Sequence, residues 1–316
     1  MHYLARRTAV AAVTLLTVAT LIFLLLHLVP GDPAEVLLSS GGMAPSHESV
    51  QALRLELGLD RPLAAQYASY LGRILQGNLG TSFQDHASIS AEIARRLPRT
   101  LELILASTAL SLLVGIPAGL LAALRRGGFW DGFFASLASL GLSMPAFVTG
   151  TLLILLFSQT LKLVPAGGYV GFWESPGQHL IYLLMPSISI AVGLIPVVFR
   201  MVRTSVLEFL EREWVRTARA KGLGEGRVLT LHVLRNALSP VVTVIGLHLG
   251  TLLGGTVLVE YVFNWPGLSG MLVQAVEQRD YPAVQGIVLV ICILFVLINL
   301  GVDVIYGLLD PRVRTR

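Results

Sequence analysis

Six long stretches without charged residues dominate this chain and constrain the class of fold that it can adopt. A bilayer core of about 30 Å needs roughly 20 apolar residues in helical form. The six stretches are Val10–Val29, Leu103–Leu124, Phe133–Leu161, Leu180–Phe199, Ala237–Val259 and Pro282–Val302. None of them holds Asp, Glu or Arg. We therefore predict an all-α polytopic membrane protein with six transmembrane helices.

The placement of charge predicts the orientation of these helices. Charged residues make up 13% of the chain, about half of what a soluble domain carries. With both termini in the cytoplasm, most of the 23 Lys and Arg residues fall on the cytoplasmic side, as the positive-inside rule requires. This asymmetry explains the net charge of +4, so no nucleic-acid partner is implied.

The spans divide the chain into four parts. Residues 1–29 form the first transmembrane helix, which is longer than the hydrophobic part of a cleavable signal peptide. Residues 30–100 form an extracytoplasmic helical segment. Residues 101–309 hold the other five helices, with a cytoplasmic loop at 201–236, and residues 310–316 form a cytoplasmic tail.

The extracytoplasmic segment is predicted to be folded. Its pattern favours a helix ending at Gly58, a second from Pro62 to Gly77, and an amphipathic piece from Ile89 to Leu97 that leads into the second span. Two interpretations stay open for this segment. It packs as a cap on the outer membrane face, or it offers a contact surface to an extracytoplasmic partner.

Sequence motifs argue against an enzyme. The run Gly267-Leu268-Ser269-Gly270 has the spacing found in intramembrane serine proteases, but no histidine follows His248 to act as a base. No phosphate-binding loop and no cluster with metal-ligand spacing exists in the sequence. The single cysteine, Cys292, excludes an internal disulfide. We therefore expect no catalytic residue, no cofactor and no metal in this chain.

Two features stand out as candidates for binding or movement. In the cytoplasmic loop, an amphipathic helix through Trp214 and basic residues is predicted to end at a group of three glycines, of which Gly222 is the first. In the fifth span, small residues recur every four positions and favour close helix packing. These packing or pathway candidates are Gly246, Gly250, Gly254 and the adjacent Gly255, together with the mid-span His248.

The order of motifs resembles one known family over nearly the whole chain. The loop from Glu213 to Leu223 is similar to the cytoplasmic loop of binding-protein-dependent ATP-binding-cassette (ABC) permeases of the dipeptide, oligopeptide, glutathione and nickel class. Further matching motifs are Pro30-Gly31-Asp32-Pro33, Leu57-Gly58-Leu59-Asp60, Gly77-Asn78-Leu79-Gly80, Arg96-Leu97-Pro98-Arg99-Thr100, Val262-Phe263-Asn264-Trp265-Pro266-Gly267, Arg279-Asp280-Tyr281-Pro282 and Leu309-Asp310-Pro311-Arg312. The loop departs from the broader E-A-A-x-x-x-G consensus, in which only Ala218 and Gly222 match. It follows the version of the peptide and nickel branch instead.

The resemblance implies an importer subunit of the plasma (inner) membrane of a bacterium, with the transmembrane fold of type I ABC importers. It implies a second homologous permease chain, two ATPase subunits that bind ATP and Mg, and an extracytoplasmic substrate-binding protein. The residues that it assigns to coupling with the ATPase are Glu213, Arg216, Thr217, Ala218, Arg219, Ala220, Lys221 and Gly222. Small peptides are the leading substrate, with nickel chelates or glutathione as alternatives. An ion-coupled secondary transporter is the competing class.

Overall fold

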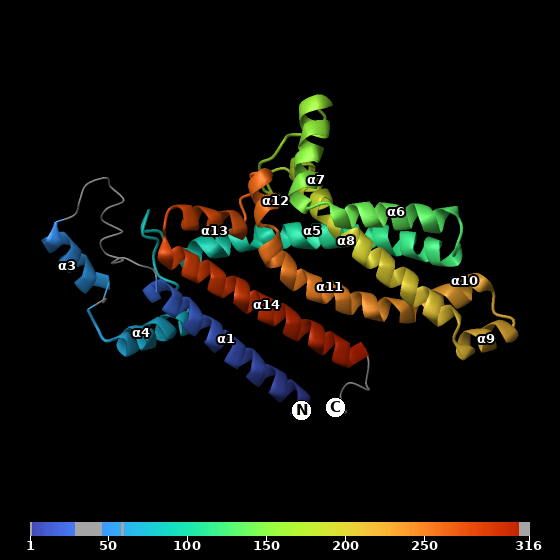
Figure 1. The fold of residues 1–316 in the computed structure, drawn as a ribbon, viewed down its shortest axis with the longest axis horizontal. Coiled ribbons are helices and arrows are strands. Elements are labelled where there is room, and N and C mark those ends of the chain that lie inside the picture. The colour runs from blue at the N-terminus through green and yellow to red at the C-terminus, as the bar shows by residue number, and fades with distance from the viewer. Residues whose placement is uncertain (1, 29–45, 58–59, 310–316) are drawn as a thin grey trace. The chain divides into compact units, whose positions relative to one another are not determined.

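The computed structural model describes residues 2–28, 46–57 and 60–309, which are helices joined by loops (Figure 1). Of helical residues 2–5, 25–28, 53, 56–57 and 303–309 only the backbone is described. The motif at Pro30 and residues 310–316, which are predicted to form a cytoplasmic tail, lie outside the described residues. The chain divides into two compact units, residues 1–96 with 271–296, and residues 97–270 with 297–316.

Five helices in the described part are long and apolar enough to cross a membrane. They are α1 (His2–Leu28), α5 (Ile89–Leu124), α8 (Pro176–Leu210), the continuous helix formed by α10 (Glu225–Arg227), η2 (Val228–Leu234) and α11 (Arg235–Gly255), and α14 (Tyr281–Leu309). The piece predicted at Ile89–Leu97 is the start of α5 rather than a separate element, because Pro98 removes one hydrogen bond without ending the helix.

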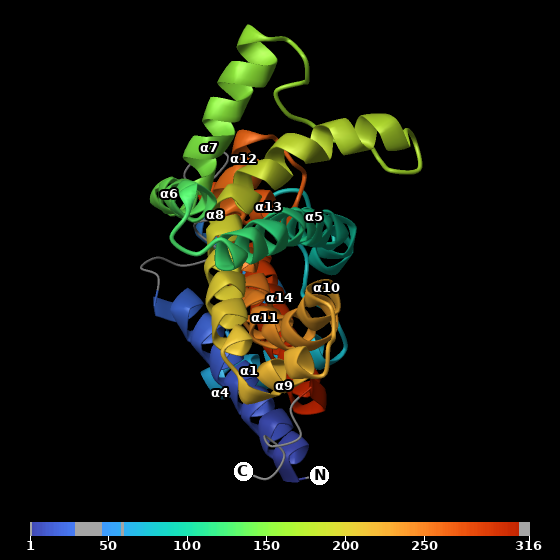
Figure 2. The same cartoon turned by 90° about the vertical axis from the view of Figure 1, so that its right-hand side faces the viewer.

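The third predicted span is broken. Its first half is α6 (Phe129–Ser143), and its second half is α7 (Ala146–Leu153) with the π-helix η1 (Ile154–Thr160). The two halves are bent by 101°, and Figure 2 shows α7 leaving α6 at a steep angle. Pro145 has no N–H to donate and keeps Met144 in an extended conformation, with φ −101° and ψ 119°. Residues 2–28, 46–57 and 60–309 thus provide up to six candidate spans when this bent pair is counted as one.

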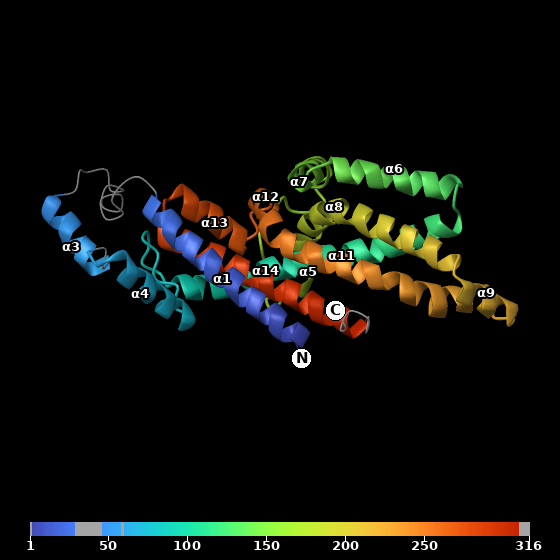
Figure 3. The same ribbon diagram turned by 60° about the horizontal axis from the view of Figure 1, so that its bottom comes forward.

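Helix α8 is the central element of the second unit, where it contacts α6, α7 and α11 (Figures 1 and 3). Four buried residues line one side of it at helical spacing, namely Leu194, Val198, Val202 and Val206. They pack in one cluster with Ala237, Val241 and Ile245 of α11. This cluster continues to the loop at 201–236, so the loop shares a core with two of the spans.

Two glycines let α5 approach α8 closely. A Cβ on Gly119 would lie 2.8 Å from both the Phe199 carbonyl oxygen and Val202 Cβ. A Cβ on Gly115 would lie 2.8 Å from Val198 Cβ. Small residues at such crossings allow backbones to pack against each other within a membrane.

Gly119→Ala is therefore expected to lower the stability of the protein by about 1–3 kcal/mol, because neither the carbonyl nor Val202 Cβ can turn away. Gly132→Ala is the matched control, since nothing lies within 4 Å of a Cβ placed there. Thermal unfolding of both variants in the same detergent measures the difference. Equal unfolding temperatures would contradict the close packing of α5 on α8.

The first unit contains α1, α3 (His47–Leu57), α4 (Leu63–Leu75), the loop that follows α4, most of α13 (Leu268–Glu277) and the first half of α14. Helices α3 and α4 lie close to where the sequence predicts two short helices, and Gly58, the predicted end of the first, lies outside the described residues. Tyr70 of α4 packs in a cluster with Phe23 of α1 and Leu289 of α14. The Thr20 and Tyr67 hydroxyls are 2.6 Å apart and join α1 to α4.

Candidate functional site

The loop at 201–236 carries a short helix, α9 (Glu213–Ala220), held against the core of the second unit (Figure 3). Val215 and Ala218, three residues apart on one face, are buried in the cluster that also contains Val206 and Val233. The other residues of α9 are exposed. The helix is therefore fixed on one side and open on the other.

The end of α9 explains why glycine stands at position 222. The Leu223 N–H donates to the Ala218 carbonyl at 3.3 Å, and the Gly222 N–H donates to the Arg219 carbonyl at 2.9 Å. Gly222 has φ +77°, which completes the hydrogen-bond pattern of a Schellman motif. Gly226, in contrast, lies inside α10 and does not interrupt that helix.

Ion pairs within the chain already neutralise both arginines of α9. The Arg219 guanidinium donates two hydrogen bonds to the Glu225 carboxylate, at 2.7 and 3.2 Å, and so bridges α9 to α10. Arg216 donates to Glu213 at 3.0 Å. Lys221 has no ion pair or hydrogen bond from its side chain within the described residues. Among the basic residues from Glu213 to Gly222, Lys221 is therefore the one whose charge is unpaired within the described residues.

The open face of α9 differs from the one expected from the sequence. Ala218 was expected to contact a partner, but only 7% of it is exposed because it anchors the helix to its own core. The exposed positions are Glu213, Trp214, Arg216, Thr217, Arg219, Ala220, Lys221 and Gly222. The Trp214 ring lies 6.1 Å from the Phe209 ring and 6.4 Å from that of His232, centroid to centroid. The open face thus combines one aromatic ring with small and basic groups.

The candidates in the fifth span occupy different environments. Gly246 is buried against Val302, and Gly250 is buried as well. Gly254 and Gly255 are exposed, with nothing within 4 Å of a Cβ placed on either. His248 is half-buried, and its imidazole has no hydrogen bond among the described residues.

A buried carboxylate at the end of the fifth span escaped sequence reasoning. Glu260, in α12 (Val257–Val262), is 1% exposed. Its carboxylate accepts hydrogen bonds from the Thr100 hydroxyl at 2.7 Å and from the Gly270 N–H at 3.0 Å. Thr100 in turn accepts the Leu268 N–H at 2.7 Å. Glu260 therefore ties α5, α12 and the start of α13 together.

Glu260 and Ser269, the serine of the Gly267–Gly270 motif, lie in the same buried junction. Burial raises the pKa of the Glu260 carboxyl, and the hydrogen bond from Thr100 opposes that rise. Ser269 is fully buried, and its hydroxyl lies 3.2 Å from that of Thr256. The serine of the Gly267–Gly270 motif therefore takes part in packing this junction, as the absence of a following histidine suggests.

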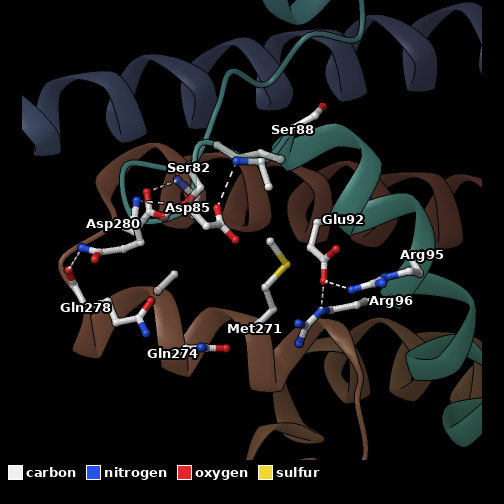
Figure 4. Close-up of a pocket in the computed structure, with 15 residues that line it drawn as sticks. Ser82, Asp85, Ser88, Glu92, Arg95, Arg96, Met271, Gln274, Gln278 and Asp280 are labelled. Carbon is white, nitrogen blue, oxygen red and sulfur yellow. Dashed lines mark hydrogen bonds and ion pairs between the residues drawn. The ribbon is translucent and has the colours of Figure 1, made fainter.

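A polar pocket of about 220 Å³ lies in the first unit (Figure 4). Asp280 accepts hydrogen bonds from the Ser82 hydroxyl at 2.6 Å and from the Phe83 N–H at 3.2 Å. On the other wall, Glu92 pairs with Arg95 at 2.7 Å and with Arg96 at 2.6 Å. The bonds to Asp280 join the loop that follows α4 to the turn between α13 and α14, whereas the Glu92 pairs lie within the first turns of α5.

Similarity to known structures defines the class of protein. The fold resembles that of a chain in the inward-facing MetNI methionine ABC transporter, with a TM-score of 0.57 and 19% identity. The match covers 69% of this chain and 96% of that one. The chain therefore has the membrane-subunit fold of an ABC importer.

Sequence similarity then gives the family. Residues 115–315 match the family described as binding-protein-dependent transport system inner membrane component, and residues 1–104 match its N-terminal region. The chain is 38% identical to the dipeptide transport system permease protein of Escherichia coli (strain K12), with 99% of both chains covered. It is 41% identical to a protein of Brucella suis biovar 1 (strain 1330) that is named as a peptide permease, again with 99% of both covered. This chain belongs to the family of binding-protein-dependent inner-membrane transport components.

Family membership confirms the expected class, location and general partners. The chain is a multi-pass inner-membrane permease and has no catalytic activity of its own. Its partners are an ATPase, which binds the ATP, and a binding protein.

Proposed function

We propose that this chain forms half of the translocation pathway of a peptide importer, with a second homologous permease chain as the other half. Two ATPase subunits power the pair, and an extracytoplasmic binding protein delivers di- or oligopeptides. The names of the relatives from Escherichia coli and Brucella suis support the peptide as substrate. In this assembly, residues 101–309 form the transport core and 30–100 the extracytoplasmic segment.

The anchored helix α9 is the single observation that supports the coupling role most strongly. Its open face, which includes Trp214, Ala220 and Lys221, seats in a groove of the ATPase. Its buried face, through Val215 and Ala218, shares a core with α8 and α11. Because interiors are close-packed and resist deformation, a push on α9 moves both spans rather than bending the loop.

The Arg219–Glu225 bridge strengthens this transmission. It joins the end of α9 to the continuous helix that carries α11, across the turn at Gly222. Two parallel hydrogen bonds from a guanidinium to a carboxylate fix orientation as well as distance. Both side chains are partly exposed, so the bridge adds modestly to the link that the shared core makes between α9 and the fifth span.

Uptake competition tests the substrate. The complete transporter, with its binding protein, is reconstituted into proteoliposomes that contain ATP, and uptake of a labelled dipeptide is measured. We expect excess unlabelled dipeptide to reduce this uptake at least about tenfold, while glutathione and a nickel–histidine chelate leave it unchanged. Uptake of labelled nickel or glutathione, with no competition by dipeptides, would identify one of the alternative substrates. Transport without nucleotide, driven by an ion gradient, would contradict the importer mechanism.

A further inference from the structure

A groove of about 540 Å³ runs between α6 and α8 in the second unit. Residues from the start and middle of α6 form one wall, and residues from the second half of α8 form the other. The lining residues used below are Asp131, Gly132, Ala135 and Ser139 on α6, with Arg200 and Arg203 on α8. The proposed coupling role of α9 does not involve this groove.

Asp131 and Arg203 neutralise each other at one end of the groove. The Arg203 guanidinium donates to both carboxylate oxygens of Asp131, at 2.6 and 2.8 Å. Asp131 also accepts the Gly127 N–H at 3.0 Å and is only 8% exposed. This pair fastens α6 to α8 and contributes no net charge to the groove.

Arg200 carries the uncompensated charge of the groove. Its side chain is exposed, and no acidic group of the described residues lies within ion-pair distance of it. Its guanidinium makes one long hydrogen bond, 3.4 Å, to the Ser139 hydroxyl. Arg200 follows directly after the predicted span Leu180–Phe199, so the groove opens near the end of that span, where a guanidinium can reach water.

The residue pattern of α6 distinguishes this groove from a lipid-facing surface. At about 100° per residue, Gly132, Ala135 and Ser139 fall on one side of the helix. The large exposed apolar residues Phe133, Leu137 and Leu140 fall on another side, which suits contact with lipid chains. Arg200 therefore lies along the side of α6 that carries small and polar groups.

We propose that the α6–α8 groove lines the translocation route and that Arg200 attracts the carboxylate of the transported substrate there. This inference builds on the proposed function, in which peptides supply that carboxylate. A guanidinium is suited to the task, since it stays charged and can bind a carboxylate with two hydrogen bonds. The neutral Asp131–Arg203 pair leaves the attraction of Arg200 for anions unopposed.

Charge-selective labelling tests this proposal directly. Ser139→Cys is introduced with Cys292→Ser, so that the transporter has a single thiol in this chain, and the complete complex is labelled in inside-out membrane vesicles. The rates of reaction with a negative sulfonate and with a positive ammonium methanethiosulfonate reagent are compared. We expect Arg200→Gln to lower the ratio of the negative to the positive rate about tenfold, and Arg200→Lys to leave it within about twofold.

Two other cysteine positions on α6 serve as controls for the labelling measurement. Ala135→Cys on the same side of α6 repeats the measurement if Ser139→Cys does not assemble. Leu137→Cys on the apolar side is expected to react with neither charged reagent. If both groove cysteines are also unreactive, the groove faces lipid or another chain and the proposal fails. It also fails if Arg200→Gln leaves the ratio unchanged.

A substrate arm separates this proposal from the proposed function. Millimolar dipeptide should slow the labelling of Ser139→Cys at least about threefold, while the same dipeptide with a C-terminal amide should not. Equal protection by both would overturn carboxylate binding by Arg200. Loss of protection with the charge preference intact would instead overturn the peptide as substrate and leave the anion-attracting groove in place.

Discussion

Gly222→Trp is expected to reduce substrate uptake and co-purification of the ATPase to less than about a tenth of wild type, with membrane insertion unchanged. Gly222 has φ +77°, and a side chain in that conformation costs about 1–2 kcal/mol. A tryptophan that avoids this cost must distort the end of α9, and the indole adds bulk beside the open face of that helix. Uptake in vesicles and pull-down from mild detergent measure the two effects.

Gly222→Asn is the matched control for this change. Asn tolerates positive φ far better than Trp, and nothing in this chain lies within 4 Å of a Cβ at this position. We expect this variant to keep most of the uptake. Normal recovery of the ATPase with Gly222→Trp would argue against docking through the end of α9.

Glu260→Ala is expected to destabilise the protein by about 3 kcal/mol. The change leaves the Thr100 hydroxyl and the Gly270 N–H without their acceptor in a buried junction, and each unsatisfied donor costs about 1–3 kcal/mol. It also leaves a cavity beside Gly267, against which the carboxyl packs. Thermal unfolding of the solubilised protein measures the loss.

Two further variants separate acceptor loss from cavity formation. Glu260→Gln fills the same volume but turns an NH₂ group toward one of the two donors, so about half of the loss is expected. Gly267→Ala keeps the carboxylate but leaves no room for it, so the junction must shift and stability must fall. Wild-type stability for all three variants would show that Glu260 does not join these helices.

Much of the fold could be predicted because hydrophobic spans follow from local composition. A stretch such as Leu180–Phe199 must be helical in a bilayer, since every backbone N–H and carbonyl needs a partner within the segment. The end of α9 could also be predicted, because helices commonly end at a glycine in the left-handed conformation, as Gly222 is. These features depend on neighbours in sequence, and the sequence shows them directly.

The parts that were missed depend on neighbours far along the chain. Ala218 and Ala220 are equivalent by residue type, yet Ala218 is buried because Val206 and Val233 cover that side of α9. Glu260 follows directly after the predicted fifth span, where a carboxylate is ordinarily at the surface. Its partner Thr100 is 160 residues away in sequence, so no local pattern indicates that it is buried.

The break in the third span has a consequence for assembly. The last backbone carbonyl groups of α6 accept no hydrogen bond from a later turn of the same helix, because the chain turns at Pro145. Hydrocarbon cannot satisfy such groups, whereas water or another polypeptide can. Ser143 and Pro145 are exposed in this chain on its own. When the protein lies in a bilayer, this elbow therefore needs water or another polypeptide beside it.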